Sequence, residues 1–324
     1  MEKQRKEFLE KLLRIKEIGA LSGLLIVMIV FTLLSDKFLT WQNFIGIFTT
    51  SSELGIIAIG ICFLMIAGEF DLSVGSVFAV APMIGALLAN TGFPMVLAFL
   101  IGLVFAGIIG LLNGIITIKA RIPSFIATLG SMMFFRGVLL AVSGGFPIDY
   151  KGEEQGFLNL LGGKIMFGMR ASGVWVILGT ILLSIILTQT KYGNHVSAVG
   201  GNPGTAKAVG INVNKVKIIN FMTCSVCAGL AGFTMFGRFH SIDPTAGKEL
   251  ELEAIASAVI GGALLTGGYG SIVGAFIGAF LMGVMRSGLI LAGAPSYWYQ
   301  GFIGVILVIS VIMNTKIRKA VVGE

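Results

Sequence analysis

Apolar runs of about the length needed to cross a bilayer recur along this chain of 324 residues. A transmembrane helix takes about 20 predominantly apolar residues. Several runs are shorter, so we expect some helices to be tilted, kinked or broken and to pack against protein. The ten runs lie at about residues 18–35, 52–67, 74–90, 94–117, 123–142, 173–188, 217–237, 254–266, 271–291 and 298–314. The pattern predicts an all-α integral membrane protein with about ten transmembrane helices.

The composition excludes most other classes of protein. Only 12% of the residues are charged, 56% are hydrophobic, and the mean hydropathy is +0.95. A soluble domain carries about 25% charged residues to cover its surface. These values exclude a soluble enzyme, a disordered chain and an ordinary nucleic-acid-binding protein.

The net charge of +7 comes mainly from basic residues that flank the apolar runs. Six of them lie in the first 17 residues, four between Lys191 and Lys217, and three at the carboxyl end. With a cytoplasmic N-terminus and ten alternating spans, all of these clusters lie inside, as the positive-inside rule expects. The acidic segments 143–172 and 238–253 then lie outside. We expect a cytoplasmic amphipathic segment at 1–17, a membrane domain at 18–315 and a cytoplasmic tail at 316–324.

Glycine residues four positions apart mark close contacts between helices. Gly270, Gly274 and Gly278 follow this spacing in GSIVGAFIG, and Gly110 and Gly114 repeat it. Small residues at this interval let two helix backbones approach closely. We interpret these glycines as packing residues, with a pore-lining role as the alternative.

The sequence contains no pattern of residues typical of an enzyme. No Walker motif occurs, so ATP, if it is used, binds to another polypeptide. Cys224 and Cys227 form a lone C-x-x-C inside an apolar run, which favours buried thiols over a zinc site. His195 and His240 fall on opposite sides of the predicted membrane. We therefore expect no catalytic residue, no metal site and no cofactor on this chain.

The stretch AGEFDLSVGS lies between the second and third runs. Asp71 or Ser73 is placed to cap a helix that begins near Val74, and Gly75 allows close approach of another backbone. Direct contact with a substrate is the alternative. The other charges that we place inside the membrane are Arg136 and Arg286, which we interpret as structural or snorkelling side chains.

The segment 191–217 is long and polar, and it contains four lysines without an acidic residue. Asn202 followed by Pro203 predicts a helix start, and Gly210 predicts its end. A short helix here could dock in a groove on a cytoplasmic partner, with Ala206 facing that partner. An ordinary ordered loop is the alternative.

Four stretches resemble the ribose-type sugar permeases, which are membrane subunits of bacterial ATP-binding-cassette importers for monosaccharides. They are AGEFDLSVGS (67–76), ARIPSFIATLG (120–130), VGGNPGTAKAVGI (199–211) and EAIASAVIGGALLTGGYGSIVGAFIGA (253–279). They occur in the order of the family, and the resemblance extends over nearly the whole chain. The segment 143–156 follows no family motif.

The resemblance implies a bundle like that of the vitamin B12 importer, a type II importer, in the bacterial inner membrane. It implies a homodimer or paired permease, two cytoplasmic ATPase subunits that hold ATP and Mg²⁺, and an external sugar-binding protein. Gly201, Asn202, Ala206 and Gly210 match the loop that rests on the ATPase. The acidic-serine motif is matched by Asp71, Ser73, Gly75 and Ser76.

The function that we expect is import of a ribose-like pentose or related sugar by alternating access. A permease for autoinducer 2 or nucleosides in the same family is the first alternative. An ion-coupled secondary transporter would need more ionisable residues near the membrane midplane. A membrane-embedded enzyme would need a paired acid and base or a metal cluster.

Overall fold

A computed structural model describes residues 17–152, 155–295, 297–306 and 308. The expected amphipathic segment at 1–17 lies outside these residues except for Glu17, and so does the tail at 316–324. Of the tenth expected span, 298–314, only residues 298–306 and 308 are described, and they are helical.

Within the described residues, six helices are long and apolar enough to cross a membrane. They are α3 (Trp41–Ile66), α5 (Met95–Ala120), α6 (Ser124–Ser143), α8 (Ser172–Gln189), α11 (Val213–Phe239) and α13 (Ile272–Leu291). Two shorter apolar helices are α2 (Ile18–Leu34) and α4 (Val74–Ala89). These eight helices overlap the first seven expected spans and the ninth, although α3 begins at Trp41, well before the expected start at 52. The chain is therefore a multi-pass helical membrane protein.

The eighth expected span, 254–266, differs from the helix that forms there. Helix α12 runs from Leu250 to Ile260 and has 11 residues, about 16 Å at 1.5 Å per residue. That length is about half of the hydrocarbon core of a bilayer. The helix ends at Gly261, and Gly262 has φ +92°, a left-handed conformation that favours glycine. The count of ten spans therefore stays a prediction.

Side-chain caps explain where several helices begin. Thr40 accepts a hydrogen bond from the Asn43 amide at the start of α3, and Ser271 accepts one from the Gly274 amide at the start of α13. Asn212 accepts one from the Lys215 amide at the start of α11. Each cap satisfies an amide that has no partner within its own helix.

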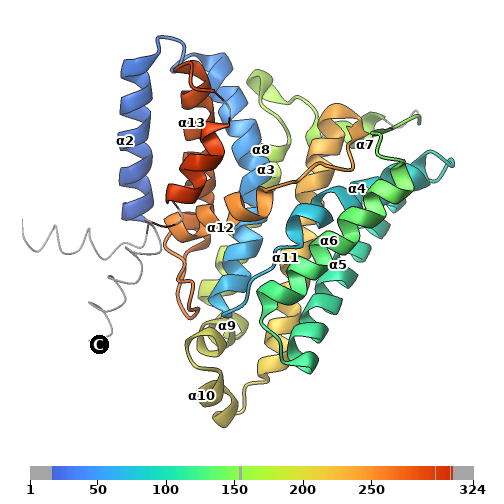
Figure 1. The fold of residues 1–324 in the computed structure, drawn as a ribbon, viewed down its shortest axis with the longest axis vertical. Coiled ribbons are helices and arrows are strands. Elements are labelled where there is room, and N and C mark those ends of the chain that lie inside the picture. Colours follow the sequence, from blue (N-terminus) through green and yellow to red (C-terminus); the bar gives the residue numbers. More distant parts are fainter. Residues whose placement is uncertain (1–16, 153–154, 296, 307, 309–324) are drawn as a thin grey trace, which may run out of the picture.

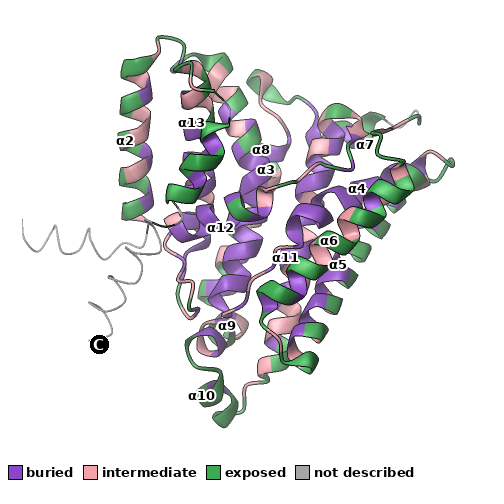
Figure 2. Ribbon diagram, in the orientation of Figure 1, coloured by how far each residue is buried: buried purple, intermediate pink, exposed green. Residues whose placement is uncertain are grey.

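Helices α3 and α11 lie at the centre of the bundle (Figure 1). Helix α3 contacts α13 and α8, α13 contacts α2, and α11 contacts α4 and α5. Figure 2 shows the burial that results: α3 is covered along most of its length, whereas α6 is largely exposed. The exposed large side chains of α5, α6 and α8 are predominantly apolar, which suits a surface in contact with lipid.

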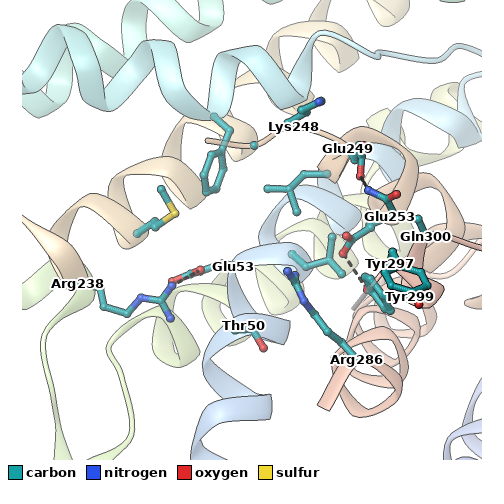
Figure 3. Close-up of a pocket in the computed structure, with 16 residues that line it drawn as sticks. Thr50, Glu53, Arg238, Lys248, Glu249, Glu253, Arg286, Tyr297, Tyr299 and Gln300 are labelled. Carbon is teal, nitrogen blue, oxygen red and sulfur yellow. Dashed lines mark hydrogen bonds and ion pairs between the residues drawn. The ribbon is translucent and has the colours of Figure 1, made fainter. Parts of the chain in front are cut away.

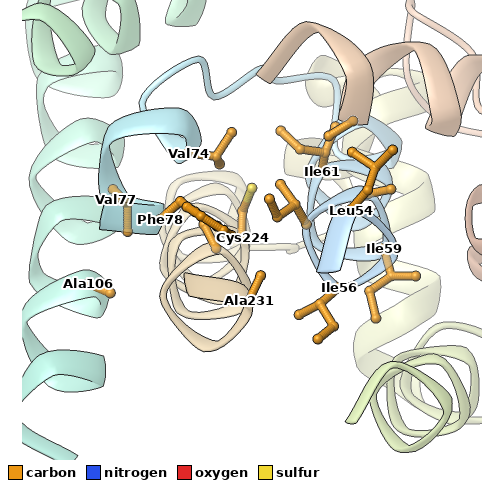
Figure 4. Close-up of a cluster of buried hydrophobic side chains, with 14 of the residues drawn as sticks. Leu54, Ile56, Ile59, Ile61, Val74, Val77, Phe78, Ala106, Cys224 and Ala231 are labelled. Carbon is orange, nitrogen blue, oxygen red and sulfur yellow. The ribbon is translucent and has the colours of Figure 1, made fainter. Parts of the chain in front are cut away.

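The central helices share one hydrophobic core, part of which Figure 4 shows. Side chains of α3, α4 and α11 meet there, among them Ile61, Phe78 and Cys224. Cys62 and Cys224 are buried, as the interpretation of the cysteines as buried thiols predicted. Cys227 is partly buried.

Gly270, Gly274 and Gly278 each lie close to another segment, with one change from the expected arrangement. A Cβ on Gly274 would overlap the Gly261 carbonyl oxygen, and one on Gly278 would overlap that of Ser257. Both contacts hold α13 close to α12. Gly270 lies before α13 begins, where a Cβ would come within 2.8 Å of the Ile66 side chain. The expected three-glycine stripe is therefore two residues on the helix and one in the loop.

The connections carry short elements of their own. The segment 143–172 contains β1 (Ile148–Asp149), α7 (Gln155–Gly162) and the 3₁₀ helix η1 (Met166–Gly168). Strand β1 pairs antiparallel with β2 (Ser241–Ile242), which follows α11. Helix α7 packs against α11. Near the opposite end of α11 lie α9 (Lys191–Gly201) and α10 (Pro203–Ala208), which project from the bundle (Figure 1).

Candidate functional site

A cavity of about 760 Å³ lies between α3, α11, α12, α13 and residues 297–300 (Figure 3). Met235 and Arg238 line the cavity, and both lie near the C-terminal end of α11, which is the end away from α10. Its polar and charged lining residues are Thr50, Glu53, Arg238, Lys248, Glu249, Glu253, Arg286, Tyr297, Tyr299 and Gln300. Three of these side chains are acidic and three are basic, so their formal charges cancel.

Glu53 of α3 and Arg238 of α11 form an ion pair at one wall of the cavity. Arg238 Nη2 lies 3.1 Å from Glu53 Oε2, and Glu53 is only 7% exposed. Glu53 Oε1 and Arg238 Nε have no hydrogen-bond partner among the described residues, and other atoms cover both. Neither residue was predicted from the sequence to be functional. The signal for Glu53 was a carboxylate inside an apolar run, which is costly to bury.

The facing wall consists of Glu253 on α12, Arg286 on α13 and the segment that contains Tyr299 (Figure 3). The Tyr299 hydroxyl donates a hydrogen bond of 3.0 Å to Glu253 Oε2. The guanidinium carbon of Arg286 lies 5.3 Å from the centre of the Tyr299 ring. Glu253 was expected in the external segment 238–253, but it belongs to the first turn of α12. Arg286 was expected to be a structural or snorkelling side chain, but it lines the cavity.

Arg136 of α6 joins three segments through backbone carbonyls. Its guanidinium donates to the carbonyl oxygens of Pro244 at 2.6 Å, Ala246 at 2.8 Å and Gly75 at 2.8 Å. This role is structural, as expected. A backbone also lies close to Gly75, as expected, because a Cβ there would come within 2.7 Å of the Gly247 carbonyl oxygen.

Asp71 is fully buried in a network of hydrogen bonds away from the cavity. Its Oδ1 accepts from the Ser73 amide at 2.8 Å and the Ser73 hydroxyl at 2.6 Å, and its Oδ2 accepts from Ser225 at 3.3 Å. Asn113 donates to the Ser73 hydroxyl at 2.8 Å. Ser73 occupies the N-cap position and α4 begins at Val74, as expected, but neither the Ser73 nor the Asp71 side chain bonds to an amide of the first turn, so the expected side-chain cap is absent. The network instead joins the 67–73 segment to α5 and α11.

Ser76, the last residue of the acidic-serine motif, is also buried. Its hydroxyl donates a hydrogen bond of 2.7 Å to the Met132 carbonyl oxygen of α6. The polar residues of the motif thus contact α5, α6 and α11 rather than the cavity.

The short helix expected after Asn202 is present. Asn202 accepts a hydrogen bond from the Thr205 amide at 3.0 Å, Pro203 occupies the first position of α10, and Gly210 has φ +86°. The rest of 191–217 is more ordered than a loop, because α9 precedes α10 and α11 begins at Val213.

The expectation that Ala206 faces a partner is wrong. Ala206 is 2% exposed and belongs to the hydrophobic core of this chain. Gly201, Asn202 and Gly210 are exposed, and Val209 is the exposed apolar side chain of this region, at 72%. The α9–α10 projection therefore presents a small surface with one prominent apolar residue.

The described residues combine a multi-pass helical bundle, a polar cavity near one end and a helical projection at the other. No group of three or more His, Cys, Asp or Glu side chains within them could hold a metal ion. A cavity with charged lining residues inside a helical membrane bundle is a candidate ligand-binding site.

The chain belongs to the family described as the permease component of the branched-chain amino acid transport system, whose profile matches residues 43–311. It is 33% identical to the ribose import permease protein of Bacillus subtilis, over 93% of both chains. It is 33% identical to the xylose/arabinose import permease protein of Sulfolobus acidocaldarius, over 91% of this chain and 83% of the relative. The autoinducer 2 import system permease protein of Yersinia pseudotuberculosis is 30% identical, over 94% of this chain and 86% of the relative.

These relatives confirm the resemblance to the ribose-type permeases. No solved structure gives a significant match to the chain.

Proposed function

We propose that this chain is the membrane-spanning permease subunit of an ATP-binding-cassette importer that moves a ribose-like pentose or related neutral monosaccharide across the bacterial inner membrane. The observation that carries the proposal is its similarity, over more than nine-tenths of its length, to permeases named for ribose and for xylose and arabinose. The chain itself is not an enzyme in this proposal, because ATP and Mg²⁺ bind to a separate subunit.

The chemistry of the cavity supports a neutral polar substrate. Sugar hydroxyls donate hydrogen bonds to carboxylates and accept them from guanidinium groups. The cavity offers both kinds of group, together with Tyr297, Tyr299 and Gln300, and its charges balance. An anionic or cationic substrate would favour an excess of the opposite charge.

The two ends of the bundle suit two different partners. The α9–α10 projection, with exposed Gly201, Asn202 and Gly210, rests on the ATPase subunit in this proposal. The opposite end, including the described residues of segment 143–156, receives the external sugar-binding protein. Two permease subunits, identical or paired, complete the pore. Both termini lie in the cytoplasm, and ATP-driven closure of the ATPase subunits opens the cavity to one side and then the other.

There are two alternatives to sugar import driven by ATP. Import of autoinducer 2 is favoured by the similarity to the Yersinia permease, and nucleosides are a further substrate class. An ion-coupled carrier would draw on the buried carboxylates of the cavity for coupling.

The test is uptake by proteoliposomes that contain this chain with the ATPase subunit and the binding protein that this proposal requires. Radiolabelled D-ribose, D-xylose and L-arabinose are offered from the side of the binding protein, with ATP on the other side. We expect uptake of at least one sugar that requires ATP and continues with a protonophore. Uptake that stops with the protonophore while ATP remains would indicate an ion-coupled carrier. Uptake of autoinducer 2 or of nucleosides alone would replace the sugar.

A further inference from the structure

Three polar side chains on one wall of the cavity hold one another in place (Figure 3). Tyr299 donates its hydroxyl hydrogen to Glu253 and presents its ring to Arg286. Glu253 and Tyr299 are each only 8% exposed. A charge-assisted hydrogen bond on one side and a cation–π contact on the other give both charged groups a defined position.

Arg286 has no ion pair within 4 Å among the residues that the structure describes. It lies on an apolar helix that is long enough to span the membrane, yet it is exposed. A charge at this depth is costly unless it meets water or a polar partner. The cavity provides that setting, because Arg286 is one of its lining residues.

The opposite wall is different, because its charges already neutralise each other. Arg238 pairs with Glu53, and the unpartnered atoms of this pair are covered by their surroundings. Of these two guanidinium groups that line the cavity, only that of Arg286 has no ion pair among the described residues and is therefore available to a ligand.

We propose that Arg286 and Glu253, positioned by Tyr299, form the site that binds the hydroxyl groups of the sugar inside the permease. Arg286 donates hydrogen bonds to sugar oxygens through its planar fork, and the Glu253 carboxylate accepts a hydrogen bond from a neighbouring hydroxyl. This inference rests on the proposed function and adds the residues that contact the substrate.

The test measures binding without turnover. The three native cysteines are replaced by alanine, and a single cysteine replaces Thr50, which is exposed and lines the cavity. The rate at which the cysteine at position 50 reacts with a water-soluble thiol reagent is measured in the complex of this chain with the ATPase subunit and the binding protein. D-ribose, D-xylose or L-arabinose is added, and betaine serves as the osmotic control. We expect at least one sugar, but not betaine, to slow the reaction.

Arg286→Met and Glu253→Gln should each raise the sugar concentration for half-protection at least about tenfold, the fold-change expected from losing one hydrogen bond to a charged group. Arg286→Lys keeps the positive charge but not the planar guanidinium, so it should raise the sugar concentration for half-protection by less than Arg286→Met does. Tyr299→Phe keeps the ring but not the hydroxyl, so it should weaken protection without altering the reaction rate in the absence of sugar. Lys164→Gln, an exposed basic residue outside the cavity lining, should leave protection unchanged.

Protection that survives Arg286→Met and Glu253→Gln would overturn the site, and so would its absence in the parent protein. Should Arg286→Met not assemble, Arg286→Lys and Tyr299→Phe decide the question, and full protection in both would reject the site. The proposed function is judged separately, by ATP-dependent uptake in the unsubstituted system. Uptake without protection contradicts only the inference, whereas no uptake of any of the three sugars contradicts the function.

Discussion

Gly200 in α9 packs so closely against Ile66 at the end of α3 that a Cβ on Gly200 would overlap the Ile66 carbonyl oxygen. The same oxygen accepts a hydrogen bond of 2.8 Å from the Gly268 amide, in the loop between α12 and α13. Gly68, in the turn after α3, lies against Gly200 and Gly267. The projecting α9–α10 pair thus contacts, backbone to backbone, the two irregular segments that interrupt the bundle.

Gly200→Ala is expected to destabilise the protein by about 1–3 kcal/mol, because the added methyl group meets backbone that cannot move aside cheaply. Gly201→Ala is the matched control, since nothing lies within 4 Å of a Cβ at that position. Alanine favours the helix over glycine by up to about 1 kcal/mol. Thermal unfolding in detergent should therefore show a lower Tm for Gly200→Ala only. Equal Tm values for the two variants would show that the contact is looser than described.

Removing one member of the Glu53–Arg238 pair should be far more damaging than removing both. Arg238→Met leaves a buried carboxylate without its partner, which costs about 3–5 kcal/mol. The double variant Glu53→Met, Arg238→Met replaces the pair by apolar side chains and should recover most of that loss. The measurement is a double-mutant cycle on the midpoint of thermal unfolding. Additive losses in the double variant would mean that the two side chains do not interact.

Asp71→Ala should reduce the amount of folded protein, because it leaves the Ser73 amide and hydroxyl and the Ser225 hydroxyl without their acceptor. Each buried group left unsatisfied costs about 1–3 kcal/mol. Since Asp71 does not line the cavity, uptake per folded complex should be retained. A variant that folds to the normal level but no longer transports would show that Asp71 acts in transport itself and not only in stability.

Val209→Glu tests whether the α9–α10 projection contacts the ATPase. Val209 is 72% exposed, so the substitution should leave folding intact while placing a charge in the proposed contact, where its desolvation is expensive. Co-purification of the ATPase subunit and sugar uptake should fall together. Ala206→Glu, at a residue that is 2% exposed, should instead prevent folding. Normal retention of the ATPase by Val209→Glu would place the contact elsewhere.

The predicted orientation can be tested with single cysteines at Asn202 and Lys151, both of which are exposed. In a background without the three native cysteines, a membrane-impermeant thiol reagent added to intact cells should label Lys151→Cys and leave Asn202→Cys unlabelled. Permeabilised cells should label both. Labelling of both positions in intact cells would contradict the assignment of these segments to opposite sides.

Local sequence rules accounted for features that depend on neighbouring residues. The start of α10 at Asn202 and Pro203 and its end near Gly210 follow from capping and from the conformational freedom of glycine. The spans themselves follow from the length of each apolar run. The spacing of Gly274 and Gly278 also predicted a close contact between helices, although the sequence did not identify α12 as the helix that they contact.

The cavity could not be found in this way, because its residues come from distant parts of the chain. Glu53 and Arg238 are 185 positions apart, and Glu253 and Tyr299 are 46 positions apart. Periodicity says that such a residue lies on a helix but not which helix faces it. Ala206 illustrates the same limit, since its burial depends on how α10 folds back on the bundle.

The sequence by itself determined the class of the protein, the location of most spans and the local form of the α9–α10 region, because hydropathy and capping act over a few residues. Only the tertiary structure decided which charged side chains form ion pairs and which charged side chains line the cavity without one. It also decided which segments the glycines contact. Those outcomes depend on burial and on contacts between segments remote in the chain, and the energy of a charge in a membrane protein is set by its surroundings.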